Sequence, residues 1–360
     1  MTDTKNAQDT RFPVTLLTGF LGAGKTTLLN TILSKKNGPR IAVIVNEFGE
    51  AGLDHDLIEA VDEDIVLMQS GCLCCSIRGD LSRTLQNLVT RKQEERVTFD
   101  RIVIETTGLA DPGPILQTFL VDSYLAQNFK MDGVVTVVDA ATGPDTLDRQ
   151  FEAVSQVAMA DLLVLSKTDL VSSDISTAFQ KRLKSLNPTA DIVRADHGQM
   201  PTEVLWDLSG MHSQGKSDQA IAWLTPPAPR DPFENLSGFA SSDRSPPPPH
   251  HHDTRIGSAS IVLQEPIPAA AFDLWLDTLI MLRGPDILRV KGIVHLEDFE
   301  TPFVFHGVQH LFDPPVPLTD WPKENHQSRI VVIARDMSRA ELVRSLDMLR
   351  ARQSAEIETV

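Results

Sequence analysis

A glycine-rich segment between an apolar run and a helical pattern constrains the fold of this chain more than any other feature. Residues 19–26 read GFLGAGKT, with the apolar run Val14–Thr18 before them and a helical pattern from Lys25 to about Lys36. Glycines let the backbone curl so that successive N–H groups point inward, where they can hold phosphate oxygens. The positive end of the following helix adds to this attraction. The segment therefore predicts a strand–loop–helix unit that binds nucleotide phosphates, with an unliganded turn as the less favoured alternative.

The side chains of this loop have separate expected roles. Lys25 would neutralise the β and γ phosphates, and the Thr26 hydroxyl would be a ligand of Mg²⁺. We expect the whole segment to hold the nucleotide, through Gly19, Gly22, Ala23, Gly24, Lys25, Thr26 and Thr27.

Further apolar runs follow at intervals that leave room for helices. They are Ile41–Val45, Ile65–Met68, Arg101–Glu105, Gly133–Asp139 and Leu162–Ser166. These runs are near-continuous rather than alternating, as expected for parallel strands that are covered on both faces. Apolar stripes at helical spacing lie between them, at Leu81, Leu85, Leu88 and Val89 and at Phe179, Leu183 and Leu186. The alternation predicts a doubly wound α/β domain with a mostly parallel sheet.

The composition changes near Ser213. Eight of the 23 prolines fall between Pro226 and Pro249, and His250–His252 follow directly. Such a segment is typical of a mobile linker. Strand and helix patterns resume at Ile256, including a capping box of Ser338 and Glu341. We therefore expect five parts: a tail over 1–11, a first domain over 12–212, a linker over 213–255, a smaller α+β domain over 256–352, and a tail over 353–360.

The segment LSKTDL after the last of these strands concerns the choice of base. Asp169 is placed to accept hydrogen bonds from the N1–H and the exocyclic amine of guanine, and Lys167 could lie over the base. Charge-assisted bonds contribute roughly 1.5–3 kcal/mol each, so two would favour GTP over ATP by roughly a hundredfold to ten-thousandfold. Ser166 stands where guanine-binding segments usually have Asn. We expect this change to remove an amide that braces the phosphate loop and so to loosen the selectivity for GTP. An ordinary turn is the alternative.

Glu105 and Gly108 end another apolar strand in the sequence ETTG. An acidic residue followed three positions later by glycine is the pattern of the switch loop in nucleotide hydrolases. We expect Glu105 in the Mg²⁺ shell and the Gly108 N–H at the γ-phosphate. The pattern alone is weak, but the carboxyl end of a parallel strand is the edge at which ligands bind.

The three cysteines of the chain, Cys72, Cys74 and Cys75, lie within four positions. An odd, clustered set is not a disulfide framework, and buried small apolar side chains are the alternative. Three thiolates favour Zn²⁺ or Cu(I) over Mg²⁺. Structural zinc sites usually have four protein ligands, so this site needs a further carboxylate, a water or a partner. Glu47, in the acidic segment NEFGE, is the candidate, with a solvated acidic loop as the alternative.

Histidines provide two weaker signals. His250–His252 beside Asp253 could collect a metal or could be solvated spacer. His306 and His310 lie four residues apart, and a surface pair without function is the favoured interpretation.

Charge and hydropathy exclude several classes of partner. The formal net charge is −16 and the isoelectric point is about 5.0, so nucleic acid is a poor general partner. No apolar run reaches the 18 residues of a membrane span. The polar start MTDTKNAQDT lacks the plan of a secretory signal. We expect a cytoplasmic protein with no nucleic-acid or membrane partner.

Taken together, these motifs resemble the CobW-like metallochaperone GTPases, a branch of the P-loop GTPases related to the urease and hydrogenase nickel-maturation proteins. The resemblance rests on GFLGAGKTT, NEFGE, GCLCC, ETTGLADPGPI, SKTD, ILRVKGIVHL and FVFHGVQHLFD, and it covers about residues 12–351. It implies a GTPase domain followed by the CobW C-terminal domain. It also implies that Cys72, Cys74 and Cys75 bind the ion to be delivered.

The function expected from this resemblance is GTP-dependent transfer of zinc to a client apo-metalloprotein. Cobalt delivery for cobalamin synthesis, a metal- and GTP-sensing regulator that delivers nothing, and a P-loop kinase acting on a small molecule are the alternatives. Hydrolysis should be slow, because we see no built-in arginine finger or water-positioning glutamine. Metal, a second copy of the chain in a homodimer, or the client would then complete the site.

Overall fold

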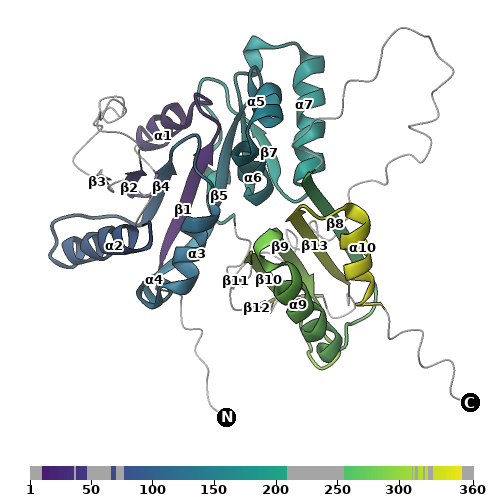
Figure 1. Ribbon diagram of the computed structural model, residues 1–360. Coiled ribbons are helices and arrows are strands. Elements are labelled where there is room, and N and C mark those ends of the chain that lie inside the picture. Colours follow the sequence, from purple (N-terminus) through teal and green to yellow (C-terminus); the bar gives the residue numbers. More distant parts are fainter. Residues whose placement is uncertain are drawn as a thin grey trace, which may run out of the picture. The chain divides into compact units, whose positions relative to one another are not determined.

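The fold is taken from a computed structural model of the chain (Figure 1). The structure describes residues 10–35, 38–46, 66–69, 77–208, 255–309, 311–312, 315–318, 321–322 and 327–350. Residues 10–208 form one compact unit, and nearly all described residues after 255 form a second. The predicted linker 213–255 lies almost entirely outside the described residues.

The first unit is built on a parallel sheet of seven strands in the order β3-β2-β4-β1-β5-β6-β7. Consecutive residues of its central strands are buried, although they point to opposite faces, so both faces are covered. This confirms the predicted doubly wound α/β fold. The strands are β1 (Phe12–Gly19), β2 (Ile41–Asn46), β3 (Val66–Gln69), β4 (Arg101–Thr106), β5 (Phe129–Asp139), β6 (Leu162–Ser166) and β7 (Asp191–Arg194).

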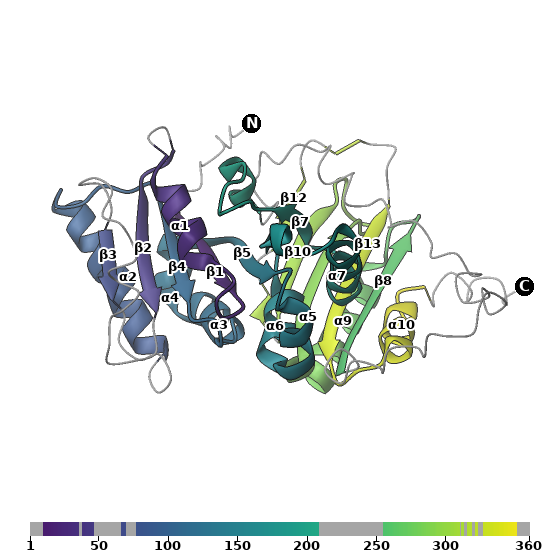
Figure 2. The ribbon, with the colours of Figure 1, turned by 90° about the horizontal axis from the view of Figure 1, so that it is seen from above.

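Helices flank this sheet in both ribbon views (Figures 1 and 2). They are α1 (Lys25–Leu33), α2 (Ile77–Gln93), α3 (Gly113–Val121), α4 (Ser123–Asn128), α5 (Gly143–Arg149), α6 (Phe151–Met159) and α7 (Ser173–Leu186). The predicted stripes of α2 and α7 are buried, because each turns one apolar face toward the core. Within the described part of the chain, no helix combines the length and the apolar character needed to cross a membrane.

The predicted boundaries differ from the structure where local signals were weak. Helix α1 ends at Leu33, before the predicted Lys36, and β5 begins four residues before the predicted Gly133. Strand β7 was not predicted, because its four residues include charged Asp191 and Arg194 and are only partly buried.

A second sheet has six strands, with the main order β11-β10-β9-β13-β8 and β12 beside β10. All of its strands except β11 belong to the second unit, and those five pair antiparallel. The strands of this sheet are β8 (Ile256–Leu263), β9 (Ile287–Val294), β10 (Phe303–Val308), β11 (Leu311–Phe312), β12 (Val316–Pro317) and β13 (Ser328–Arg335), and the helices of the second unit are α9 (Ala269–Arg283) and α10 (Arg339–Asp347). The predicted α+β class is confirmed, and so is the capping box of Ser338 and Glu341. Helix α10 ends before the predicted Arg352.

Candidate functional site

The phosphate loop joins β1 to α1, and its glycines adopt the backbone conformations that the motif requires. Gly22 and Gly24 have φ angles of 72° and 95°, in the left-handed region that side chains rarely tolerate. Gly24 is the N-cap of α1, and a Cβ atom at either glycine would meet nothing within 4 Å. The loop therefore faces open space at the start of a helix, which is the arrangement that binds phosphate.

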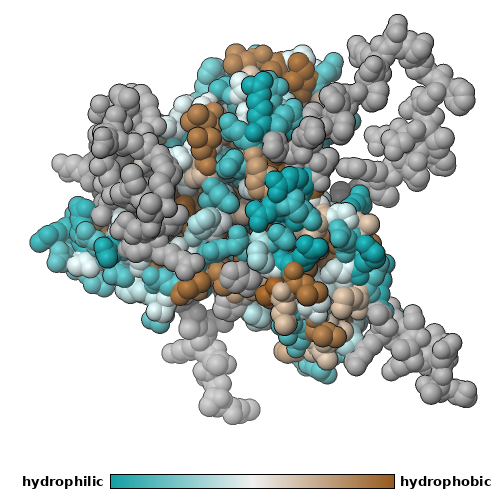
Figure 3. All heavy atoms as spheres, viewed as in Figure 1, coloured by the Kyte–Doolittle hydropathy of each residue, from teal (hydrophilic) through white to brown (hydrophobic). Residues whose placement is uncertain are grey.

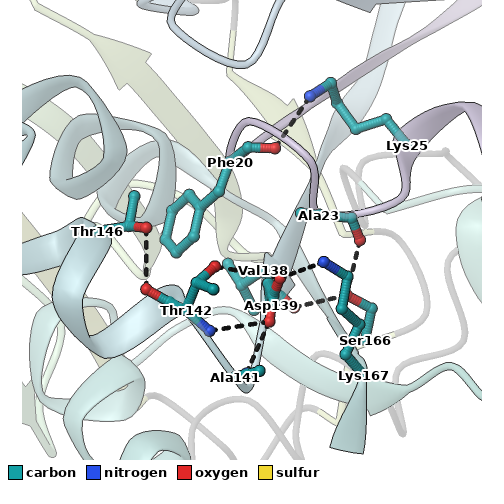
Figure 4. A network of polar contacts seen from close by, with 10 residues as sticks. All are labelled: Phe20, Ala23, Lys25, Val138, Asp139, Ala141, Thr142, Thr146, Ser166 and Lys167. Atoms are coloured by element: carbon teal, nitrogen blue, oxygen red, sulfur yellow. Dashed lines mark hydrogen bonds and ion pairs between the residues drawn. The ribbon is translucent and has the colours of Figure 1, made fainter. Parts of the chain in front are cut away.

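Lys25 is buried in this loop. Its Nζ donates hydrogen bonds to the carbonyl oxygens of Gly19 and Phe20, each at 3.1 Å. Figure 4 shows the bond to Phe20. Because the ammonium group lies along the curled backbone, its charge is held beside the place where phosphate oxygens are expected.

The two predicted Mg²⁺ ligands come together. The Thr26 hydroxyl donates to Oε1 of Glu105 at 3.3 Å, although 79 residues separate them in the sequence. Glu105 is buried at the end of β4, next to the phosphate loop on β1. One carboxylate and one hydroxyl provide the hard oxygen ligands that Mg²⁺ prefers, so the residues present fit this ion.

Gly108 lies against the phosphate loop. A Cβ atom at this position would be 2.4 Å from the Cα of Leu21, which leaves no room for any side chain. The Leu21 and Leu109 side chains are exposed, at 66% and 53%. The face drawn in Figure 3 is mostly hydrophilic, with scattered apolar patches. The segment after β4 is therefore in direct contact with the loop that the sequence predicts to hold the phosphates.

Ser166 corrects one expectation from the sequence. Its Oγ lies 2.7 Å from the carbonyl oxygen of Ala23 and 3.2 Å from that of Val138 (Figure 4). A hydroxyl has one proton to donate, and Ala23 is the nearer acceptor. The expected loss of the brace is wrong, because the serine hydroxyl itself ties this segment to the phosphate loop.

Asp139 is a site residue that the sequence reasoning missed. It lies at the end of β5, is 1% exposed, and accepts hydrogen bonds from the backbone N–H groups of Ala141 and Thr142 and from Lys167 Nζ at 2.6 Å (Figure 4). Burial raises the pKa of Asp139, but the bonds from Lys167 and the two N–H groups outweigh it, so the pKa lies below its ordinary value. The ion pair fixes Lys167 beside Asp169. An acidic residue at the end of an apolar strand was the available signal.

Asp169 lies in a short 3-10 turn (Thr168–Leu170) after β6, with its side chain exposed. A second loop at this edge, after β7, was not predicted. A Cβ atom on its Gly198 would be 3.1 Å from the carbonyl oxygen of Thr27. The first turn of α1 is therefore in contact with the loop that follows β7. Since β7 pairs with β6, this loop begins close to the end of β6.

The predicted metal ligands Cys72, Cys74, Cys75 and Glu47 lie outside the described residues, as do His250–His252 and His310. Among the residues that the structure describes, no cluster of three or more His, Cys, Asp or Glu side chains could hold a metal ion. The described strands nevertheless fix where the chain leaves the sheet. Strand β2 ends at Asn46 and β3 at Gln69, and both pair in parallel at the same edge as Glu105.

Comparison with known proteins agrees with this geometry. Residues 13–194 match the model of the CobW/HypB/UreG nucleotide-binding domain, and residues 256–350 match that of the cobalamin synthesis protein cobW C-terminal domain. The chain is 33% identical over 335 residues to the zinc chaperone YjiA of Escherichia coli, covering 91% of this chain and 96% of that protein. It is 33% identical over 353 residues to zinc-regulated GTPase metalloprotein activator 1 of Schizosaccharomyces pombe, covering 91% and 83%.

A solved structure shows the same architecture. The Zn(II)-bound YjiA GTPase from E. coli has a TM-score of 0.71 and 28% sequence identity, covering 94% of this chain and 99% of that one. One domain match covers each unit, and the two relatives and this structure each cover more than 90% of the chain. The chain therefore belongs to the family of proteins that combine a CobW/HypB/UreG nucleotide-binding domain with a CobW C-terminal domain.

Proposed function

We propose that this chain hydrolyses GTP and uses it to deliver zinc from Cys72, Cys74 and Cys75 to a client apo-metalloprotein. The observation that carries the proposal is the register of the first sheet. Gln69 of β3 pairs with Val45 of β2, and Val45 pairs with Glu105 of β4. These three residues form one row across the sheet, so the strand that leads to the cysteines ends two strands away from β4, level with the nucleotide-site carboxylate that β4 carries.

This row limits the distance between the cysteine segment and Glu105. Neighbouring strands lie about 4.8 Å apart, so the Cα atoms of Gln69 and Glu105 are roughly 10 Å apart. Cys72 follows Gln69 by three residues, and a chain extends by at most about 3.6 Å per residue. These limits support a thiolate site close enough to sense occupation of the nucleotide site. Glu47, which directly follows β2, is the proposed carboxylate ligand.

The nucleotide half of the proposal rests on Lys25, Thr26, Glu105 and Asp169. Thr26 and Glu105 would hold Mg²⁺, which supplies charge neutralisation for the phosphates when bound. Asp169, beside the fixed Lys167, would read guanine. The relatives named as zinc chaperones and as a zinc-regulated GTPase support both parts.

Energetics favour transfer to a docked client. Coupling between two sites typically amounts to about 1–3 kcal/mol, whereas thiolate zinc sites hold the ion with about 10 kcal/mol or more. A change of nucleotide could not by itself empty such a site. We therefore propose ligand exchange with a metalloprotein in the cytoplasm, with a homodimer as one way to complete the slow GTPase site.

A zinc titration with and without GTP tests the proposal. We expect one zinc per chain whose affinity changes with nucleotide, and loss of that zinc in the triple variant Cys72→Ser, Cys74→Ser, Cys75→Ser. A YjiA variant lacking one glutamate and two cysteines is still Zn(II)-bound, so stoichiometry, rather than the presence of zinc, is the readout. Unchanged stoichiometry in the triple variant would reject the cysteine site. Activation of an apo-client without hydrolysable GTP would reject GTP-dependent delivery.

A further inference from the structure

A buried glutamine on α6 holds the loop that follows β4. Gln156 is 0% exposed, and its Nε2 donates to the carbonyl oxygens of Ala110 at 2.9 Å and Gly108 at 3.3 Å. An amide NH₂ has two protons to donate, so both are used on the same short segment. The acceptors lie 46 and 48 residues earlier in the chain.

The orientation of this amide is determined by its acceptors. Turning it over would place its oxygen against two carbonyl oxygens, which is repulsive. In the orientation present, Oε1 is buried and has no hydrogen-bond partner among the described residues. Since buried polar atoms are normally paired, an apolar side chain would suit the packing of α6 better. The presence of an amide at this buried position is therefore accounted for by its two hydrogen bonds to the carbonyl groups of Gly108 and Ala110.

The segment held by Gln156 is clamped from two sides. The Ala110 N–H donates to the Thr107 carbonyl oxygen at 3.2 Å, which closes a turn over Thr107–Ala110. On one side of this turn Gly108 lies against Leu21 of the phosphate loop. On the other side the two carbonyl groups accept from Gln156. The position of Gly108 beside the phosphate loop is thus set jointly by that loop and by α6.

We propose that Gln156 is a positioning residue that holds the Thr107–Ala110 turn where Gly108 can meet the γ-phosphate, so that it sets discrimination between GTP and GDP. The inference rests on the proposed function, because it assumes guanine nucleotides in this site. GDP has no γ-phosphate, so its binding should not depend on this turn. Gln156 acts through this turn and does not itself contact the nucleotide.

Gln156→Met tests the inference, since Met has a similar length and no donor. In the full chain with Mg²⁺, we would measure affinities for fluorescent GDP and for a fluorescent non-hydrolysable GTP analogue, together with single-turnover hydrolysis of GTP. We expect the affinity for the analogue to fall roughly tenfold, as for the loss of one to two hydrogen bonds. Affinity for GDP should stay within about twofold, and hydrolysis should slow at least as much as analogue binding weakens. If the Met variant does not fold, Gln156→Leu serves the same purpose.

Asn187 offers a matched control. It is also a buried amide, and its Nδ2, with two protons to donate, lies within hydrogen-bond distance of the carbonyl oxygens of Val157, Ala158 and Ala160 at the end of α6. Asn187→Ala should lower stability without changing the ratio of analogue to GDP affinity. An unchanged ratio in both Gln156 variants would overturn the inference and leave the proposed function standing. Wild-type protein that binds neither guanine nucleotide would overturn both.

Discussion

The two sheets of this protein place polar side chains differently. In the parallel sheet, Glu105, Asp139 and Ser166 occupy the last or next-to-last positions of β4, β5 and β6. In the antiparallel sheet, Arg289 lies in the interior of β9 and Arg329 near the start of β13, at 6% and 4% exposed. Burial lowers the pKa of Arg329 below its ordinary value.

The difference follows from how each sheet is covered. Strands that are covered on both faces have mostly apolar interiors, with Thr15, Asp132 and Thr136 as buried exceptions. The polar side chains of the candidate nucleotide site gather where the strands end and loops begin. The antiparallel sheet keeps polar groups within its strands, at a cost in desolvation. Substitutions at the strand ends of the first sheet should therefore change nucleotide binding, whereas substitutions in the second unit should change stability.

The largest effect is expected for Lys25→Ala, at the start of α1 in the loop that follows β1. Removing one preorganised cationic donor should lower the rate of GTP hydrolysis by about a hundredfold or more. Single-turnover hydrolysis measures this, and circular dichroism controls for the fold. Hydrolysis within about threefold of the wild type would mean that the loop is not the phosphate site.

Asp169→Ala is expected to change the choice of base. Loss of two charge-assisted hydrogen bonds to guanine should reduce the preference for GTP over ATP roughly a hundredfold. Competition binding with both nucleotides measures the ratio. The affinity for ATP should stay constant, and a preserved ratio would show that another group reads the base.

Asp139→Asn is expected to remove a pH-dependent contribution to stability that the wild-type carboxylate makes. The pKa of Asp139 is lowered in the folded protein, so its stabilising effect is present above the unfolded value of about 3.9 and is lost as the pH falls through the lower folded value. Urea unfolding should show the variant to be about 1–3 kcal/mol less stable at neutral pH, with the gap closing below about pH 4. A gap independent of pH would argue against the ion pair with Lys167.

Ser166→Ala should have a smaller effect. The variant loses one neutral hydrogen bond to Ala23, so affinity for GTP should fall about fivefold, equivalent to about 1 kcal/mol. Ser166→Asn, which can still donate to this carbonyl, should bind like the wild type. Equal losses in both variants would show that the side-chain volume matters instead of the brace.

Ser338→Ala, in the second unit, should give the smallest effect on function. Loss of the capping box should lower the free energy of unfolding by about 1 kcal/mol. Urea denaturation measures this loss, and GTP affinity should not change. A clear change in nucleotide binding would contradict the division of roles between the two sheets.

Local signals allowed part of this structure to be predicted. The phosphate loop, the stripes of α2 and α7 and the capping box at Ser338 each depend on residues a few positions apart, so their spacing is visible in the sequence. The contacts of Ser166 with Ala23 and of Gln156 with Ala110 join residues 143 and 46 positions apart. No local pattern reports such pairs, which is why the brace was misjudged and Gln156 was overlooked.

The sequence by itself therefore determined the fold class, the phosphate loop and the identity of the residues offered to nucleotide and metal. Only the tertiary structure decided which of these residues meet. It paired Thr26 with Glu105, fixed Lys167 through Asp139, and set Gln69 in one row with Glu105. The physical reason is that strand order and register, which local propensity does not encode, bring the ends of parallel strands to one edge.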